Sequence, residues 1–268
     1  MSLSIQHPWL IYHQPNPRAT IRLFCFPYVG SSASIYRSWA TSGILPAEVE
    51  VCAVELPGHG TRQDEPLLSD FSLLAQNLAE VVHADTKQAI ALFGHSLGAL
   101  MSFEVSRQLY DRYGLVPNHL FVSACLAPHI ADDCPDIYDG NTLLAYIRGL
   151  GGLPNENMIL RRQPLFQADF ALRRSFRYVA GSILPCPITA FGGEADPLVS
   201  PDALAAWRTH TRAFAQHTLP GNHFFIHSVQ RQLLQLIGQA MQHDDQRRVS
   251  RFENEEKKGD LYGKKFIR

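Results

Sequence analysis

The pentapeptide Gly94-His95-Ser96-Leu97-Gly98 has the residue types and spacing of a nucleophilic serine. It follows the apolar run Ala89–Phe93 and precedes a segment with helical character, Ala99–Tyr113. A G-x-S-x-G motif between a strand and a helix is typical of a nucleophile elbow, where small neighbours allow a strained turn. The N-terminus of the following helix favours negative charge at the same place. An ordinary small-residue turn is the alternative; the flanking elements favour Ser96 as a nucleophile.

Serine is a weak nucleophile at neutral pH, so it needs a base, and the base needs an orienting carboxylate. Asp196 is the preferred acid because it lies in a loop after the apolar run Pro187–Phe191. Glu194 is a close competitor and Asp202 a weaker one. A turn-forming role before Pro197 is the structural alternative for Asp196.

His223 is the preferred base among the 12 histidines of the chain. It lies between the apolar run Phe214–Leu219 and the helical segment Phe225–Met241. His217 falls inside the run and His227 inside the helical segment, which makes both less suitable. The order serine, acid, histidine along the chain is that of the α/β-hydrolases.

A developing oxyanion needs two backbone N–H donors. Leu97, directly after the serine, is the first candidate. The second is Val29, in the loop Pro27–Ser32 after the apolar run Ile21–Phe26, with Tyr28 as its alternative. An ordinary Gly/Ser turn is the competing interpretation of this loop.

Short apolar runs alternate with helical segments, which predicts an α/β fold: a mostly parallel sheet covered by helices on both faces. An antiparallel edge strand at Trp9–His13, paired with Ile21–Phe26, is also expected. The further predicted strands are Val49–Leu56 and His119–Cys125, and the further predicted helices are Phe71–His83 and Ala203–His210.

About sixty residues after Cys125 carry no strand signal, and a gap of this length is usually a lid or an inserted subdomain. We expect a helical lid over residues 131–184, with helices at Thr142–Gly149 and Leu165–Tyr178. Lid side chains are candidates for an acyl or pantetheine channel, although plain lid packing is the commoner role. We expect one domain over residues 1–245 and a disordered charged tail over 246–268. The channel candidates are Leu160, Leu165, Phe166 and Phe170.

The composition limits the class of partner. The chain has 268 residues and a formal net charge of −1, so neither nucleic acid nor an anionic membrane is indicated. Five cysteines without a C-x-x-C spacing argue against a disulfide framework or a zinc site. The N-terminal residues lack the pattern of a signal peptide, and a cytoplasmic location is expected.

Several motifs together resemble the type II thioesterases that accompany nonribosomal peptide and polyketide synthases. The resemblance covers about residues 23–237. It implies an α/β-hydrolase fold with a helical lid, no metal or organic cofactor, and a monomeric state. The motifs are Leu23–Gly30, Tyr36–Trp39, Glu55–Arg62, Phe93–Ala99, Phe121–Ala124, Gly151–Pro154 and Gly221–Phe225.

The resemblance also implies a reaction: hydrolysis of acyl thioesters on the phosphopantetheine arm of carrier proteins, which removes wrongly loaded groups. Ser96, Asp196 and His223 fall on the family's triad positions, and Val29 falls on an oxyanion-hole position. The candidate substrate-binding residues are Tyr28, Phe166, Phe170 and Phe224.

The sequence departs from the family pattern at two places. Val29-Gly30-Ser31 stands where the family has a small residue and two glycines, which bears on the geometry of the oxyanion hole. Gln167 stands where the lid motif Pro-x-x-Arg-Ala-Asp has arginine, which bears on lid contacts and acyl preference.

Two other functions fit the same residues. A carboxylesterase or lipase on this fold would cleave oxygen esters without help from a carrier protein. A hydrolase-fold scaffold that binds a ligand without cleaving it is the non-enzymatic alternative, and the complete serine, aspartate and histidine set argues against it.

Overall fold

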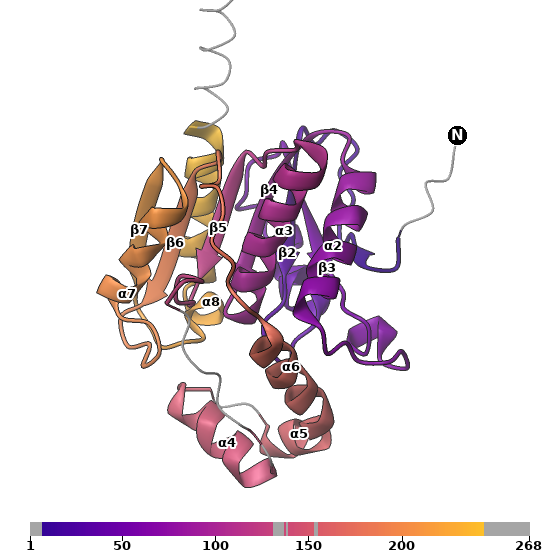
Figure 1. Ribbon diagram of the computed structural model, residues 1–268, viewed down its shortest axis with the longest axis vertical. Helices are drawn as coiled ribbons and strands as arrows, with labels where there is room; N and C mark the ends of the chain where they lie inside the picture. The colour runs from indigo at the N-terminus through magenta and orange to yellow at the C-terminus, as the bar shows by residue number, and fades with distance from the viewer. Residues whose placement is uncertain (1–6, 131–136, 138, 153–154, 244–268) are drawn as a thin grey trace, which may run out of the picture.

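The computed structural model describes residues 7–130, 137, 139–152 and 155–243, which form one seven-stranded sheet with helices on both faces (Figure 1). The strand order is β1-β3-β2-β4-β5-β6-β7, and all neighbours are parallel except β1 and β3. The strands are β1 (Leu10–Ile11), β2 (Ile21–Phe26), β3 (Val49–Val54), β4 (Ala89–His95), β5 (His119–Ser123), β6 (Ile188–Gly193) and β7 (Phe214–Leu219).

The predicted pairing of the N-terminal edge strand was wrong. The strand is antiparallel and lies at the edge, but Leu10 pairs with Val54 of β3 and not with β2. Strand β2 is flanked by β3 on one side and β4 on the other, and its side chains are almost all buried. A nearly uniform apolar run is typical of such an interior parallel strand, so β2 has no free edge for β1.

Successive side chains of the central strands point to opposite faces and enter two separate cores. On β2, Phe24 and Phe26 join the core beneath α2 and α3, whereas Leu23 and Cys25 join the core beneath α1 and the last helical residues. The helices that flank the sheet are η1 (Ala33–Tyr36), α1 (Arg37–Thr41), α2 (Phe71–Asp85), α3 (Leu97–Tyr113), α7 (Pro201–Ala205), η3 (Ala206–His210) and α8 (Phe225–Ser228); η2 (Gly60–Arg62) lies in the loop after β3.

Local signals explain the helix ends. Asp70 caps α2 by accepting the N–H of Leu73, and Gly114 ends α3 in the left-handed conformation with φ 62°. The predicted α/β architecture is confirmed. The final helix differs from its prediction because it is interrupted at Val229, after which residues 230–243 are helical again.

Three helices between β5 and β6 lie outside the layers of the sheet, at the bottom of Figure 1. They are α4 (Gly140–Gly149), α5 (Glu156–Arg161) and α6 (Gln163–Ser175), and we call them the inserted helices. Their mutual core is small and includes Leu143, Ile147, Ile159 and Phe170. The sequence predicted α4 and α6 but not α5, which is too short for a clear periodic pattern.

The predicted charged tail, 246–268, and the start of the predicted lid, 131–136, lie outside the described residues. Within the described part of the chain, no helix combines the length and apolar character needed to cross a bilayer.

Candidate active site

Ser96 lies at the turn between β4 and α3, with φ 52° and ψ −118°. This positive φ is rare for a residue with a side chain and marks local strain. Neither glycine of the motif leaves room for a side chain. A Cβ on Gly94 would lie 2.0 Å from the carbonyl oxygen of Gly98, and a Cβ on Gly98 would lie 2.3 Å from the carbonyl oxygen of Phe26. The Ser96 N–H donates to the Ser123 carbonyl at 2.8 Å, which fixes the turn against β5.

His223 and Asp196 come together from the loops after β7 and β6. The imidazole Nδ1 lies 2.9 Å from Oδ2 of Asp196, and both side chains are buried. A carboxylate only accepts, so Nδ1 carries the proton and Nε2 of the neutral ring keeps its lone pair. Of the two competing acids, Glu194 is exposed after β6 and Asp202 is exposed in the first turn of α7. The structure therefore pairs His223 with Asp196.

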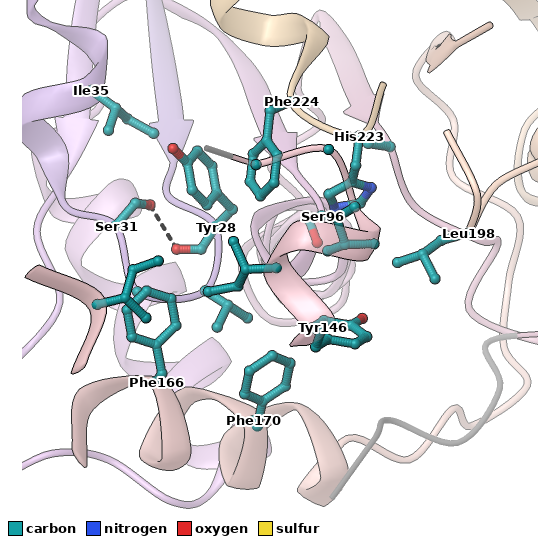
Figure 2. A pocket seen from close by; sticks show the side chains of 18 of the residues that line it. Tyr28, Ser31, Ile35, Ser96, Tyr146, Phe166, Phe170, Leu198, His223 and Phe224 are labelled. Atoms are coloured by element: carbon teal, nitrogen blue, oxygen red, sulfur yellow. Dashed lines mark hydrogen bonds between the residues drawn. The ribbon is translucent and has the colours of Figure 1, made fainter. Parts of the chain in front are cut away.

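A cavity of about 610 Å³ lies between the strand ends and the inserted helices. Ser96 and His223 both line it, as do all four candidate substrate-binding residues (Figure 2). Leu160 and Leu165, the other two channel candidates, are not lining residues: Leu160 is 40% exposed and Leu165 is buried elsewhere in α6. The inserted helices, with Arg162 between α5 and α6, contribute to the wall Tyr146, Ile147, Met158, Ile159, Arg162, Phe166, Phe170 and Arg173.

The loop after β2 offers few backbone donors. The Gly30 N–H donates to Oδ2 of Asp169 at 2.7 Å, and the Ser31 N–H donates to the Tyr28 carbonyl at 3.0 Å. Both groups are therefore already satisfied. Among the described residues, the N–H groups of Tyr28, Val29 and Leu97 donate to no protein acceptor, so the alternative between Tyr28 and Val29 stays open. Val29, beside the cavity, and Leu97, the first residue of α3, remain the candidate donors.

Two other histidines lie close to His223. His95 contacts its ring at 5.4 Å between centroids and bonds Oγ of Ser123 through Nδ1. His227 bonds the Tyr28 hydroxyl at 2.8 Å. Burial lowers the pKa of His95 and of His227, and the neighbouring His223 lowers that of His95 further. Both rings are therefore neutral near pH 7, and of these three histidines only His223 bonds a carboxylate.

Two features of the site were missed at the sequence level. Asp169 and His59 form a buried pair beneath the loop that carries Val29. His59 belongs to a motif that carried the family resemblance, and Asp169 belongs to the lid motif from which Gln167 departs. Arg162 and Arg173 line the cavity. From the sequence, these arginines are candidates for contact with an acidic carrier protein or for a solvated helix face, and neither interpretation places them on a cavity wall. Within the described residues, no group of three or more His, Cys, Asp or Glu side chains is arranged to hold a metal ion.

Comparison with known proteins identifies the family. Residues 21–241 match the model of the thioesterase domain. The chain is 34% identical to gramicidin S biosynthesis protein GrsT of Aneurinibacillus migulanus, over 88% of this chain and 94% of GrsT. It is 38% identical to linear gramicidin dehydrogenase LgrE of Brevibacillus parabrevis, over 87% of this chain and 92% of LgrE.

A solved structure agrees with these relatives. The type II thioesterase BorB from the borrelidin biosynthetic cluster superposes with a TM-score of 0.80 at 31% identity, over 87% of this chain and 97% of that one. The expected α/β-hydrolase fold is confirmed by the similarity to BorB and by the order of the strands in the sheet. The chain therefore belongs to the thioesterase family, and the resemblance of its motifs to type II thioesterases is confirmed.

Proposed function

We propose that this thioesterase releases acyl groups from the phosphopantetheine arms of carrier proteins in a nonribosomal peptide or polyketide system, with Ser96, His223 and Asp196 as its catalytic residues. The observation that carries the proposal is the 2.9 Å contact between His223 and Asp196 beside a cavity that also contains Ser96. A serine, an imidazole and a carboxylate in this relation form a general apparatus for acyl transfer.

The reaction proceeds in two halves. Nε2 of His223 takes the hydroxyl proton of Ser96 as Oγ attacks the thioester carbonyl, and Asp196 stabilises the imidazolium. The N–H groups of Val29 and Leu97 hold the oxyanion. The tetrahedral intermediate expels the pantetheine thiolate, which takes the proton from His223, and leaves an acyl-serine. Water activated by His223 then releases the acid and restores Ser96.

The cavity suits an acyl pantetheine. Phe166, Phe170 and Tyr146 give it an apolar wall, which favours burial of an acyl chain. Arg162 and Arg173 add positive charge on the side of the inserted helices, and neither has an acidic partner among the described residues. A phosphopantetheine arm carries a phosphodiester, so these arginines complement its charge.

Two relatives' names suggest different uses of a similar chain. GrsT is named for gramicidin S biosynthesis, and LgrE is named a dehydrogenase. A dinucleotide site in this fold class begins with G-x-G-x-x-G after the first strand, whereas β2 is followed here by Pro27-Tyr28-Val29-Gly30-Ser31-Ser32. We therefore favour hydrolysis for this chain.

The finer assignments belong to the same proposal. We place the protein in the cytoplasm, where carrier-protein synthases are expected to work, and treat it as a monomer with one domain over residues 1–245. The inserted helices act as its lid. Sedimentation of the purified full chain at several concentrations tests the monomer, since a concentration-dependent mass near twice 30.0 kDa contradicts it.

The decisive experiment measures hydrolysis of an acetyl-phosphopantetheinyl carrier protein, of acetyl-CoA and of p-nitrophenyl acetate. Wild type and Ser96→Ala are compared on all three. Release from the carrier protein that disappears in Ser96→Ala supports the proposal. Cleavage of the oxygen ester alone, with no release from the carrier protein, favours a carboxylesterase instead.

A further inference from the structure

A carboxylate from the inserted helices reaches the loop that follows β2. Asp169 lies on α6 and is only 3% exposed. Its Oδ2 accepts the Gly30 N–H at 2.7 Å and faces Nε2 of His59 at 3.1 Å. Gly30 directly follows Val29, the candidate oxyanion donor. One oxygen atom therefore joins α6, the loop after β2 and the loop after β3.

The geometry of His59 defines the charge of this contact. Its Nδ1 lies 3.0 Å from the Pro57 carbonyl, which only accepts, and its Nε2 faces the Asp169 carboxylate. Both ring nitrogens therefore donate, and His59 is an imidazolium paired with an ionised Asp169. Burial lowers the pKa of His59, but the hydrogen bond and charge of Asp169 outweigh it, so the net pKa is raised.

The loop and α6 also meet through packing. Gly30 has φ +73°, and a Cβ built on it would lie 2.2 Å from Cε1 of Phe166, one turn before Asp169. Phe166 also lines the cavity in Figure 2. The backbone next to Val29 is thus held by a ring on one side and by a carboxylate on its N–H. An oxyanion hole depends on such fixed donors, because a donor that must reorganise during the reaction contributes less.

We propose that Asp169 is a positioning residue for catalysis: it holds the Gly30 amide so that the adjacent Val29 N–H points to the oxyanion. Through Asp169, the inserted helices thereby help to position the oxyanion donor, and they also line the cavity. This proposal rests on the proposed function in one respect, the use of Val29 as an oxyanion donor.

A purely structural role for Asp169 predicts different kinetics. If Asp169 only kept the inserted helices in place, its loss would weaken binding of the carrier-bound substrate and raise KM. A small ester needs few contacts with those helices but still develops an oxyanion. Loss of kcat on the small ester therefore separates positioning from packing.

The test compares Asp169→Ala, Asp169→Asn and Glu156→Gln with wild type, on acetyl carrier protein and on p-nitrophenyl acetate. Glu156 is the matched control, because its carboxylate lies on α5, is exposed and pairs with Arg148. We expect Asp169→Ala to lower kcat about tenfold or more on both substrates while KM changes less than about threefold. Asp169→Asn replaces the carboxylate with a neutral, weaker acceptor for the Gly30 N–H, so its kcat should fall several-fold, less than that of Asp169→Ala. Glu156→Gln should match wild type.

Two results would overturn the proposal: a folded Asp169→Ala whose kcat on the ester stays within about twofold of wild type, or an effect confined to KM of the carrier-bound substrate. Circular dichroism establishes folding. If Asp169→Ala does not fold, the decision passes to Asp169→Asn, where an unchanged kcat overturns the proposal and a several-fold loss supports it. If wild type cleaves only the ester, the proposed substrate is wrong, but the ester arm still tests Asp169.

Discussion

Nδ1 of His223 lies 2.9 Å from Oδ2 of Asp196. The other carboxylate oxygen of Asp196 accepts the N–H of Leu198 at 2.9 Å, so both oxygens are held and the carboxylate cannot rotate freely. A fixed acceptor selects one tautomer of the imidazole and leaves Nε2 available as a base.

Replacing Asp196 with Asn should therefore impair catalysis far more than binding. The amide can donate to Nδ1 and favour the wrong tautomer, and we expect kcat to fall roughly 10³–10⁴-fold with KM little changed. Steady-state release from acetyl carrier protein measures this. Glu194→Gln is the matched control, since Glu194 lies in the same loop but is exposed. A larger loss in Glu194→Gln than in Asp196→Asn would reverse the assignment of the acid.

The stability of the protein should depend on pH through His59. Its pKa is raised in the folded protein because Asp169, and to a lesser extent the Pro57 carbonyl and Glu55, outweigh the effect of burial. A raised folded pKa stabilises the folded state fully below the unfolded value, near 6.5, and the benefit is lost as pH rises through the folded pKa. As pH rises from near 6.5 through the folded pKa of His59, the Tm of wild type should therefore fall relative to that of His59→Gln. A constant difference between the two across pH 6–9 would contradict the charged pair.

The nucleophile turn should not tolerate a methyl group at Gly98. A Cβ there would lie 2.3 Å from the backbone oxygen of Phe26, and neither backbone can move without disturbing the sheet. We expect Gly98→Ala to lower the free energy of unfolding by about 1–3 kcal/mol or more. Gly149→Ala is the control, because nothing lies within 4 Å of its Cβ position and a helical alanine is favourable. Urea denaturation compares the two variants, and equal midpoints would refute the steric argument.

Charge on the cavity wall should matter for a phosphorylated substrate only. Arg162 lines the cavity, whereas Arg161 beside it is exposed and does not. We expect Arg162→Gln to raise KM for acetyl carrier protein several-fold, by loss of one charge-assisted contact, and to leave p-nitrophenyl acetate hydrolysis unchanged. Arg161→Gln should resemble wild type on both substrates. If the two variants behave alike, the arginine acts only through the general surface charge.

Local patterns were sufficient to predict the elements that place the candidate triad. Ser96, Asp196 and His223 follow β4, β6 and β7, and the carboxyl ends of parallel strands share one edge of the sheet. Predicting the strands therefore also predicted that these residues lie at the same edge of the sheet. Their catalytic roles, and those of Val29 and Leu97, stay predictions.

Contacts between distant segments could not be predicted in the same way. Leu10 pairs with Val54 rather than with β2 because the interior place beside β2 is taken by β3, which no local pattern reveals. Asp169 and His59 are 110 positions apart, and only the approach of α6 to the loops after β2 and β3 brings them into contact. Short α5 likewise depends on its neighbours more than on its own periodicity.

The inserted helices all lie between β5 and β6 in the chain. The candidate triad residues Ser96, Asp196 and His223 lie instead on the loops after β4, β6 and β7. Such an arrangement is modular, because replacing the inserted helices would change the cavity wall without rebuilding the loops that carry Ser96, Asp196 and His223. The exchange has one condition. A replacement for the inserted helices must still bring a carboxylate to the Gly30 amide. Asp169 and His59 should therefore be kept together as a pair when this segment is exchanged.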